Sequence, residues 1–301
     1  MWELDRVHRV DAIEGLKNVP DDSVDLLLTD PPYAIASKDR TTIRRGKPMS
    51  TLRAWGGWDV FHPFDYDLLI LQLITQAYRV LKPGGALYLF TSRENNGYFV
   101  RRALGRGFVY RNHLVMIKTS PLPSLSRSNW RSAFEICMYL TKGKPRVFNF
   151  LSQKELVNAF SYPIRHRSTD HPTEKPLALF ERIVRVSSNE GDLVVDPFMG
   201  SGTTAVAAKR HGRRFLGFEL NPEYVAMATN RLRLETGRSP CDRSIESRAR
   251  RLGPRGAFRG TVGPGPRGRD HLGRIGDVSG RAGPRRPGPG DRADAGAPAR
   301  P

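Results

Sequence analysis

The stretch from Thr29 to Tyr33 reads Thr-Asp-Pro-Pro-Tyr and holds the residue types best suited to chemistry. The apolar run before it, residues 24–28, predicts a buried strand, and the two prolines lack N–H donors and hold the chain extended. This extended segment, residues 30–33, is called the ledge below. It would hold a carboxylate, carbonyl oxygens and an aromatic ring in one fixed geometry. Asp30 and the Pro31 carbonyl could accept both hydrogens of an amino group on a planar substrate, while Tyr33 stacks on its ring. The alternative is that the strand simply ends here and leads into an ordinary loop, where the prolines have no functional role.

A second stretch, residues 194–205, is predicted to be a strand, a glycine-rich turn and the start of a helix. Gly200 and Gly202 let the backbone pass close to a ligand and present helix N-terminal N–H groups to it. Glu219 ends the next predicted strand, where a carboxylate can take both ribose hydroxyls of an adenosine. The pattern indicates an adenosine-containing cofactor. It also satisfies the dinucleotide pattern, so NAD stays open, whereas a P-loop is disfavoured because no Lys-Ser or Lys-Thr follows the glycines.

The elements that would position these stretches alternate between strands and helices, which is typical of a doubly wound, mostly parallel α/β sheet. Strands are predicted over residues 6–10, 24–28, 86–90, 113–118, 135–140, 192–196 and 215–219. Helices are predicted over residues 12–17, 65–81, 93–104, 176–187, 202–210 and 222–234. Ligands of such sheets bind outside the carboxyl ends of the strands, so both stretches are expected to open into one crevice.

The remaining segments lack clear periodicity. Residues 34–63 are predicted to be an irregular basic insertion, residues 120–132 a Ser/Pro-rich surface loop, and residues 142–170 an irregular basic segment. From Arg238 onward there are 15 arginines, no lysine and 6 acids among Gly, Pro, Ala and Ser. Such a segment cannot bury a core, so the division predicted is a folded domain over 1–236 and a disordered tail over 237–301.

Composition points to the class of partner. The chain of 301 residues has 49 Lys and Arg against 30 Asp and Glu, a net charge of +19, which favours a polyanionic partner. Its two cysteines give neither a disulfide framework nor metal-ligand spacing, so we expect no metal and a reducing intracellular setting. No leader pattern or membrane-spanning run is seen in the sequence, and a soluble, unexported protein is expected.

Together the motifs resemble those of the amino-group DNA methyltransferases, which act on N6 of adenine or N4 of cytosine. The similarity is to the beta class, a circularly permuted subgroup in which Asp-Pro-Pro-Tyr precedes Phe-x-Gly-x-Gly. Three further matches are His171-Pro172-Thr173-Glu174-Lys175-Pro176, Arg79-Val80-Leu81-Lys82-Pro83-Gly84-Gly85 and Trp58-Asp59. The resemblance covers residues 1–236. It implies a Rossmann-like catalytic domain, S-adenosylmethionine as donor, and adenine flipped out of double-stranded DNA for direct displacement at the methyl group.

The resemblance also implies roles for particular residues. The catalytic set comprises Asp30, Pro31, Pro32 and Tyr33. The cofactor-binding set comprises Asp11, Thr173, Lys175, Asp196, Phe198, Gly200, Gly202, Thr203 and Glu219. Glu219 would hold the ribose, and Thr173 and Lys175 would lie near the cofactor carboxylate. Asp11 would lie near the adenine, although Val10-Asp11 stands where the family usually shows Gly-Asp. Target recognition is expected within residues 140–170.

Several alternatives stay open at this point. N4-cytosine methylation on the same scaffold is the nearest, since Asp before Pro-Pro-Tyr favours adenine but the two groups overlap. An NAD-dependent oxidoreductase would account for the glycine motif but would leave the ledge at Tyr33 unexplained. A non-catalytic DNA-binding protein would not need the acidic and aromatic motif residues to be intact. Carbon-5 cytosine methylation is set aside because the sole Pro-Cys, at Pro240-Cys241, lies in the tail. A cognate restriction endonuclease, a homodimer and a cytoplasmic, nucleoid-associated location are further expectations.

Overall fold

The computed structural model describes residues 1–33, 41–44, 47–50, 63–121, 130–162 and 175–236, which all belong to one structural unit. The predictions for Trp58-Asp59, for residues 171–174 and for the tail from residue 237 lie outside these ranges. Among the described helices, none combines the length and the apolar character that crossing a bilayer requires.

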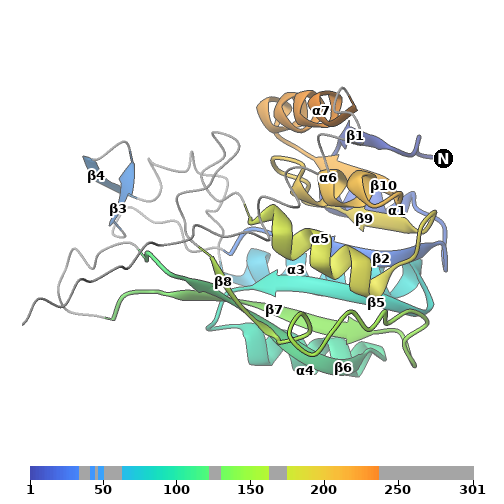
Figure 1. Cartoon of the computed structure of the whole chain (residues 1–301), viewed down its shortest axis with the longest axis horizontal. Coiled ribbons are helices and arrows are strands. Elements are labelled where there is room, and N and C mark those ends of the chain that lie inside the picture. The colour runs from blue at the N-terminus through green and yellow to red at the C-terminus, as the bar shows by residue number, and fades with distance from the viewer. Residues whose placement is uncertain (34–40, 45–46, 51–62, 122–129, 163–174, 237–301) are drawn as a thin grey trace, which may run out of the picture. The chain divides into compact units, whose positions relative to one another are not determined.

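An eight-stranded sheet forms the centre of the structure (Figure 1). Its strands run in the order β1 (Arg6–Arg9), β10 (Arg214–Glu219), β9 (Leu193–Asp196), β2 (Val24–Thr29), β5 (Leu81–Thr91), β7 (Phe134–Thr141), β6 (Val109–Lys118) and β8 (Ala159–Tyr162). Neighbouring strands are parallel except that β7 runs antiparallel to both β5 and β6. The prediction of a mostly parallel sheet is confirmed.

Helices cover both faces of the sheet, because alternate side chains of each strand point to opposite faces. Leu27 of β2 packs in a core with α1 (Ala12–Lys17), α3 (Pro63–Val80) and α4 (Asn96–Arg106). Leu26 and Leu28 pack on the other face with α5 (Leu177–Ser187), α6 (Thr203–Arg210) and α7 (Pro222–Thr236). Figure 1 shows α5 and α6 in front of the sheet and α1 and α3 behind it. The doubly wound architecture is therefore as predicted.

Two segments predicted to be irregular contain strands. Within the basic insertion, β3 (Thr41–Arg44) and β4 (Lys47–Ser50) form a separate antiparallel pair. Within residues 142–170, β8 pairs with the end of β6 at the edge of the main sheet. Both strands of the insertion and β8 are only four residues long, too short to show a period-2 pattern, and hydrogen bonds to a partner strand define them.

The boundary between α3 and β5 also differs from the prediction. The helix ends at Val80, and β5 begins at Leu81 and continues through the Lys-Pro-Gly-Gly sequence that was expected to be a helix stop. Gly84 adopts φ +79°, donates from its N–H to the Lys142 carbonyl (2.6 Å), and accepts from the Arg146 N–H (2.9 Å). These bonds tie the beginning of the strand to the chain that follows β7, which local sequence patterns cannot reveal.

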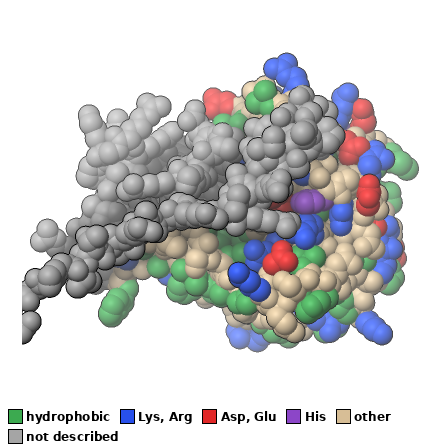
Figure 2. Space-filling model, viewed as in Figure 1, with side chains coloured by type: hydrophobic (Ala, Val, Ile, Leu, Met, Phe, Trp, Pro, Cys, Tyr) green, Lys and Arg blue, Asp and Glu red, His purple; other side chains and the backbone are tan. Residues whose placement is uncertain are grey.

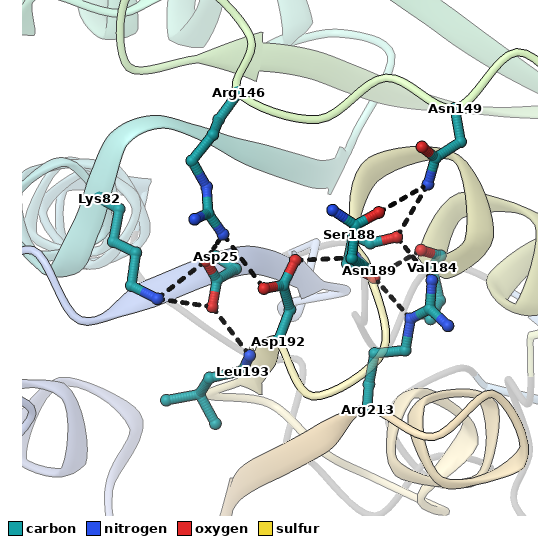
Figure 3. Close-up of polar contacts among 10 residues, drawn as sticks. All are labelled: Asp25, Lys82, Arg146, Asn149, Val184, Ser188, Asn189, Asp192, Leu193 and Arg213. Carbon is teal, nitrogen blue, oxygen red and sulfur yellow. Dashed lines mark hydrogen bonds and ion pairs between the residues drawn. The ribbon is translucent and has the colours of Figure 1, made fainter.

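At the amino end of β2, a buried carboxylate joins four parts of the chain (Figure 3). Asp25 is 4% exposed and accepts hydrogen bonds from Lys82 Nζ (2.9 Å), from the Arg146 guanidinium and from the Leu193 backbone N–H (2.9 Å). Arg146 also pairs with Asp192 at 3.1 Å. The contacts fix the start of β2 relative to β5 and β9, and so set the place where β2 ends on the opposite edge.

The face formed by α5, α6 and α7 is mixed in charge. Figure 2 shows Lys and Arg side chains there interspersed with acidic, apolar and other side chains, without one continuous basic area among the described residues. Most of the basic insertion at residues 34–63 lies outside the described residues. The side shown in Figure 2 therefore does not by itself locate a DNA-binding face.

Candidate functional site

Three carboxylates stand at the carboxyl ends of adjacent strands. Glu219 ends β10, Asp196 ends β9, and Asp30 directly follows β2. In the main sheet, the strand that follows β2 along the chain is β5, which lies on the side of β2 away from β9. The strand that follows β9 is β10, which lies on the side of β9 away from β2. The strand order therefore reverses between β9 and β2, which is where ligands bind in open α/β sheets. The two predicted stretches do meet at one edge of the sheet.

Asp196 links the two stretches through its side chain. Its Oδ1 accepts from Thr29 Oγ1 (2.7 Å) and from the Phe198 N–H (3.0 Å), and its Oδ2 accepts from Thr204 Oγ1 (2.5 Å). Burial raises the pKa of this carboxyl to about 7, against the lowering effect of these hydrogen bonds. Asp196 was predicted to line the cofactor site, and the structure places its oxygens in bonds that hold β2 and the glycine turn together.

This burial predicts a pH effect on stability that Asp196→Asn should remove. The pKa of Asp196 is about 7 in the folded protein, against an ordinary value of 3.8 for the unfolded chain. The folded protein therefore binds this proton more tightly, and its stability falls as the pH rises from 3.8 to about 7. Asparagine preserves the acceptor toward Thr29 and Phe198 and can donate to Thr204. We expect the free energy of unfolding of Asp196→Asn, relative to wild type, to rise by on the order of 1–3 kcal/mol between pH 5 and 8.

Urea unfolding at each pH measures this difference. Asp65→Asn, at the exposed first turn of α3, is the matched control and should show no such trend. A pH-independent difference between Asp196→Asn and wild type would contradict the assignment of a raised pKa to Asp196.

Glu219 organises the glycine turn. Its Oε2 accepts from the Gly200 N–H (2.9 Å) and its Oε1 accepts from the Asn221 N–H (2.8 Å). Gly200 and Gly202 have φ of +52° and +85°, conformations that favour glycine. A third backbone N–H, that of Leu220, also stabilises the charged form of this carboxyl. A carboxylate has about four acceptor positions, so Glu219 retains capacity for a hydroxyl donor. The turn and Glu219 therefore fit the ribose of an adenosine cofactor.

Three other predicted cofactor residues, Asp11, Thr203 and Phe198, have different surroundings. Asp11 caps α1, its Oδ1 accepting from the Ile13 N–H (2.9 Å) and the Glu14 N–H (3.1 Å), next to the paired strands that end at Arg9 and Glu219. Thr203 is buried and accepts from Arg231 NH1 (3.0 Å). Phe198 is half-buried and packs on the α1/α3/α4 core. Thr173 lies outside the described residues.

The Asp-Pro-Pro-Tyr ledge has the side chain of Asp30 at its centre. Asp30 Oδ1 accepts from the Tyr33 hydroxyl (2.7 Å), and its Oδ2 pairs with Lys175 Nζ. Burial raises the pKa of Asp30, while the Lys175 charge opposes that rise. Pro31 is buried and Pro32 is half-buried, so the ledge is packed at its base. The carboxyl group is thus oriented beside an aromatic ring and next to a cation.

Lys175 was predicted to lie near the cofactor carboxylate, and the structure places its ammonium between two acids of the protein. Besides Asp30 it pairs with Glu135 Oε2 at 3.1 Å, and Glu135 Oε1 pairs with Lys118 Nζ at 2.5 Å. Burial alone would raise the pKa of Glu135, but Lys175 and Lys118 outweigh it and lower that pKa to about 2. Glu135 is therefore ionised at neutral pH.

Glu135 and Lys118 were not identified as site residues from the sequence. A signal was present, because the two predicted strands 113–118 and 135–140 end and begin with opposite charges. In an antiparallel pair these two positions lie at the same edge of the sheet, which brings Lys118 and Glu135 together.

Comparisons with known proteins agree with this geometry. The model of a DNA methylase family matches residues 24–230. The chain is 33% identical over 240 residues to the type II methyltransferase M2.DpnII of Streptococcus pneumoniae, covering 75% of this chain and 88% of that protein. It is 30% identical to the type II methyltransferase M.HinfI of Haemophilus influenzae, covering 76% and 68%. A crystal structure of the M1.HpyAVI–SAM complex matches with a TM-score of 0.59 and 27% identity, covering 75% and 98%.

Proposed function

Because the chain belongs to this DNA methylase family and is an S-adenosylmethionine-dependent DNA methyltransferase, we propose that its target is the N6 amino group of adenine in double-stranded DNA. The observation that carries the proposal is the Thr29–Asp196 hydrogen bond, which joins the Asp30 ledge to the glycine turn at the strand-order reversal. A base held at the ledge and a cofactor held at the turn would then face each other. Family membership sets aside the NAD-dependent alternative.

The residues of the ledge would act by positioning and electrostatics. Bound S-adenosylmethionine supplies an electrophilic methyl group. Asp30 would accept a hydrogen bond from the target amino group and the Pro31 carbonyl a second, while Tyr33 stacks on the base. The amino nitrogen gains positive charge as it attacks, so a fixed carboxylate at hydrogen-bond distance stabilises the transition state more than the ground state. No covalent nucleophile is needed for this displacement.

On the cofactor side, we assign the ribose hydroxyls to Glu219 and the backbone of Gly200 and Gly202 to close approach. Asp196 would act through its bonds to Thr29 and Thr204, which keep the turn in register with the ledge. Asp11, Thr173, Phe198 and Thr203 complete the proposed cofactor set. The cofactor and the target base would thereby meet across the ends of β9 and β2.

Glu219→Gln should weaken S-adenosylmethionine binding. The amide would turn a donor toward either the Gly200 or the Asn221 N–H, and it would lose charge toward the ribose hydroxyls. We expect the Kd to rise about 10- to 100-fold, the value of one or two hydrogen bonds to a charged group. Isothermal titration with S-adenosylmethionine measures it, and Glu223→Gln, on the exposed first turn of α7, is the control. An unchanged Kd in Glu219→Gln would remove Glu219 from the cofactor site.

The target base is tested by incubating the full chain with unmethylated double-stranded DNA and S-adenosylmethionine, then digesting the DNA and quantifying modified nucleosides. N6-methyladenine is the expected product. N4-methylcytosine without N6-methyladenine would overturn the choice of base, while keeping the same ledge chemistry. No modified base on genomic DNA from several sources, with cofactor binding intact, would count against the proposal as a whole.

The DNA substrate suggests further partners. We propose that residues 140–170, with the segments at 34–63 and 120–132, read the target sequence, because they adjoin the carboxyl edge or carry basic and aromatic residues. We also propose a cytoplasmic, nucleoid-associated location, a cognate restriction endonuclease as biological partner, and a homodimer. Sedimentation with and without DNA would test the last of these.

A further inference from the structure

Four charged side chains form a row across the catalytic edge of the sheet. Lys118 from the end of β6 pairs with Glu135 from β7, Glu135 pairs with Lys175, and Lys175 pairs with Asp30. The row is electrically balanced, with two cations alternating with two anions. Lys175 is only 8% exposed, so it depends on these carboxylates and not on water for its stabilisation.

The position of Lys175 creates a conflict with the role assigned to Asp30. Asp30 Oδ1 already accepts from Tyr33, and its Oδ2 is occupied by the Lys175 ammonium. A target amino group that binds Asp30 must share it with this cation. A second carboxylate, that of Glu135, lies on the other side of Lys175 at 3.1 Å. The rings of Tyr33 and Phe90 are each 5.4 Å from Nζ and flank it favourably.

We propose that Lys175 is a shared cation which moves from Asp30 to Glu135 when the target amino group reaches Asp30, so that Glu135 is a positioning residue for methyl transfer. This inference rests on the proposed function, because it takes Asp30 as the acceptor of the target amino group. Glu135 would lower the cost of freeing Asp30, since the buried ammonium keeps one ion pair throughout. Lys118 would keep Glu135 ionised while Lys175 is on Asp30.

The titratable groups around this row come from four strands or from the residues directly after them. Around Lys175 they are Asp30 and Tyr33 after β2, Glu135 and Cys137 on β7, Lys118 on β6, and Asp196 on β9. Among them Lys175 lowers the pKa of Asp30 and Glu135 raises it, beneath the larger rise caused by burial. The two neighbours thus act on Asp30 in opposite directions.

Two substitutions separate a shared cation from a merely structural lysine. In Glu135→Gln, Lys175 keeps Asp30 as its sole carboxylate partner in the row, so the target amino group competes less well. We expect kcat to fall about 10-fold or more and the pKa of Asp30 to fall, because Glu135 raises it. In Lys175→Met, Asp30 loses its cation, so the pKa of Asp30 should rise.

The pKa of Asp30 is read from its carboxyl carbon by NMR titration of the full chain without cofactor or DNA, the resonance being assigned by its loss in Asp30→Asn. The acid limb of the kcat profile should move in the same directions. Asp22→Asn, which removes an exposed ion pair with Lys142, is the control and should change neither quantity. Melting temperature and S-adenosylmethionine binding show whether each variant is folded.

Shifts of opposite sign in Glu135→Gln and Lys175→Met, with reduced kcat in the former, would support the proposal. Shifts of the same sign would mean that Glu135 only holds Lys175 against Asp30, and unchanged kcat in folded Glu135→Gln would mean that no transfer of Lys175 is needed; either result overturns it. A wild-type protein that methylates no base would instead contradict the proposed function, and the NMR shifts would remain a separate measurement.

Discussion

Asp30→Ala is expected to lower the single-turnover rate of methyl transfer about 1,000-fold, the upper range for removing one preorganised electrostatic contact. The carboxylate is oriented by the Tyr33 hydroxyl and by Lys175, so it is held in place to stabilise positive charge on the target nitrogen. Asp30→Asn keeps the shape but not the charge and should lose most of the rate as well. The affinity for S-adenosylmethionine should stay close to that of wild type, because Glu219 and the glycine turn are untouched.

Rapid-quench measurement of methylated DNA gives the rate, and titration calorimetry gives the cofactor affinity. Asp21→Ala, whose side chain is 69% exposed and pairs with Arg79 far from the ledge, is the matched control and should retain full activity. Loss of cofactor binding in folded Asp30→Ala would move Asp30 to the cofactor side. Full activity in that variant would remove the ledge from the mechanism.

Asp25→Ala is expected to cause the largest loss of stability, about 3–5 kcal/mol. The substitution leaves the buried Leu193 N–H without its acceptor and takes the carboxylate from Lys82 and Arg146 (Figure 3). Both cations are partly exposed, at 34% and 44% of their side chains, so water recovers part of the cost and the lower end of the range is favoured. Arg146 also keeps Asp192.

Urea unfolding of the full chain measures this loss. Asp21→Ala serves again as a control, since an exposed ion pair should contribute no more than about 1 kcal/mol. A loss below 1 kcal/mol in Asp25→Ala would show that solvent replaces the carboxylate and that the cluster is not what fixes β2.

The sequence predicted the parts of the fold that depend on local pattern. The apolar runs at 24–28 and 215–219 became β2 and β10, and the glycines at 200 and 202 introduced α6 as expected. It also predicted that Asp30 and Glu219 share an edge, because parallel strands place their carboxyl ends together. What it could not predict was pairing between distant segments, such as β8 beside β6 or the start of β5 beside Lys142.

The directions of side chains were equally out of reach. Asp196 was predicted to line the cofactor site, and the sequence did not show that its oxygens also accept hydrogen bonds from Thr29 and Thr204. Lys175 was assigned by motif to the cofactor carboxylate, but its contacts depend on Glu135, which reaches the site because β7 runs antiparallel. The pairing of Lys175 with Asp30 and Glu135 joins residues that are far apart in the sequence, so no local spacing indicates it.

The antiparallel course of β7 has an evolutionary consequence. Because β7 begins at the carboxyl edge and β2, β6 and β8 end there, the connections after Tyr33, after Lys118 and after Tyr162 all depart from the same side of the sheet. The half that carries β9, β10 and β1 has only short connections at that side. Since we propose that the three connections after Tyr33, Lys118 and Tyr162 read the target, exchanging or lengthening them would change the DNA sequence that is recognised without altering the strands that carry Asp196 and Glu219.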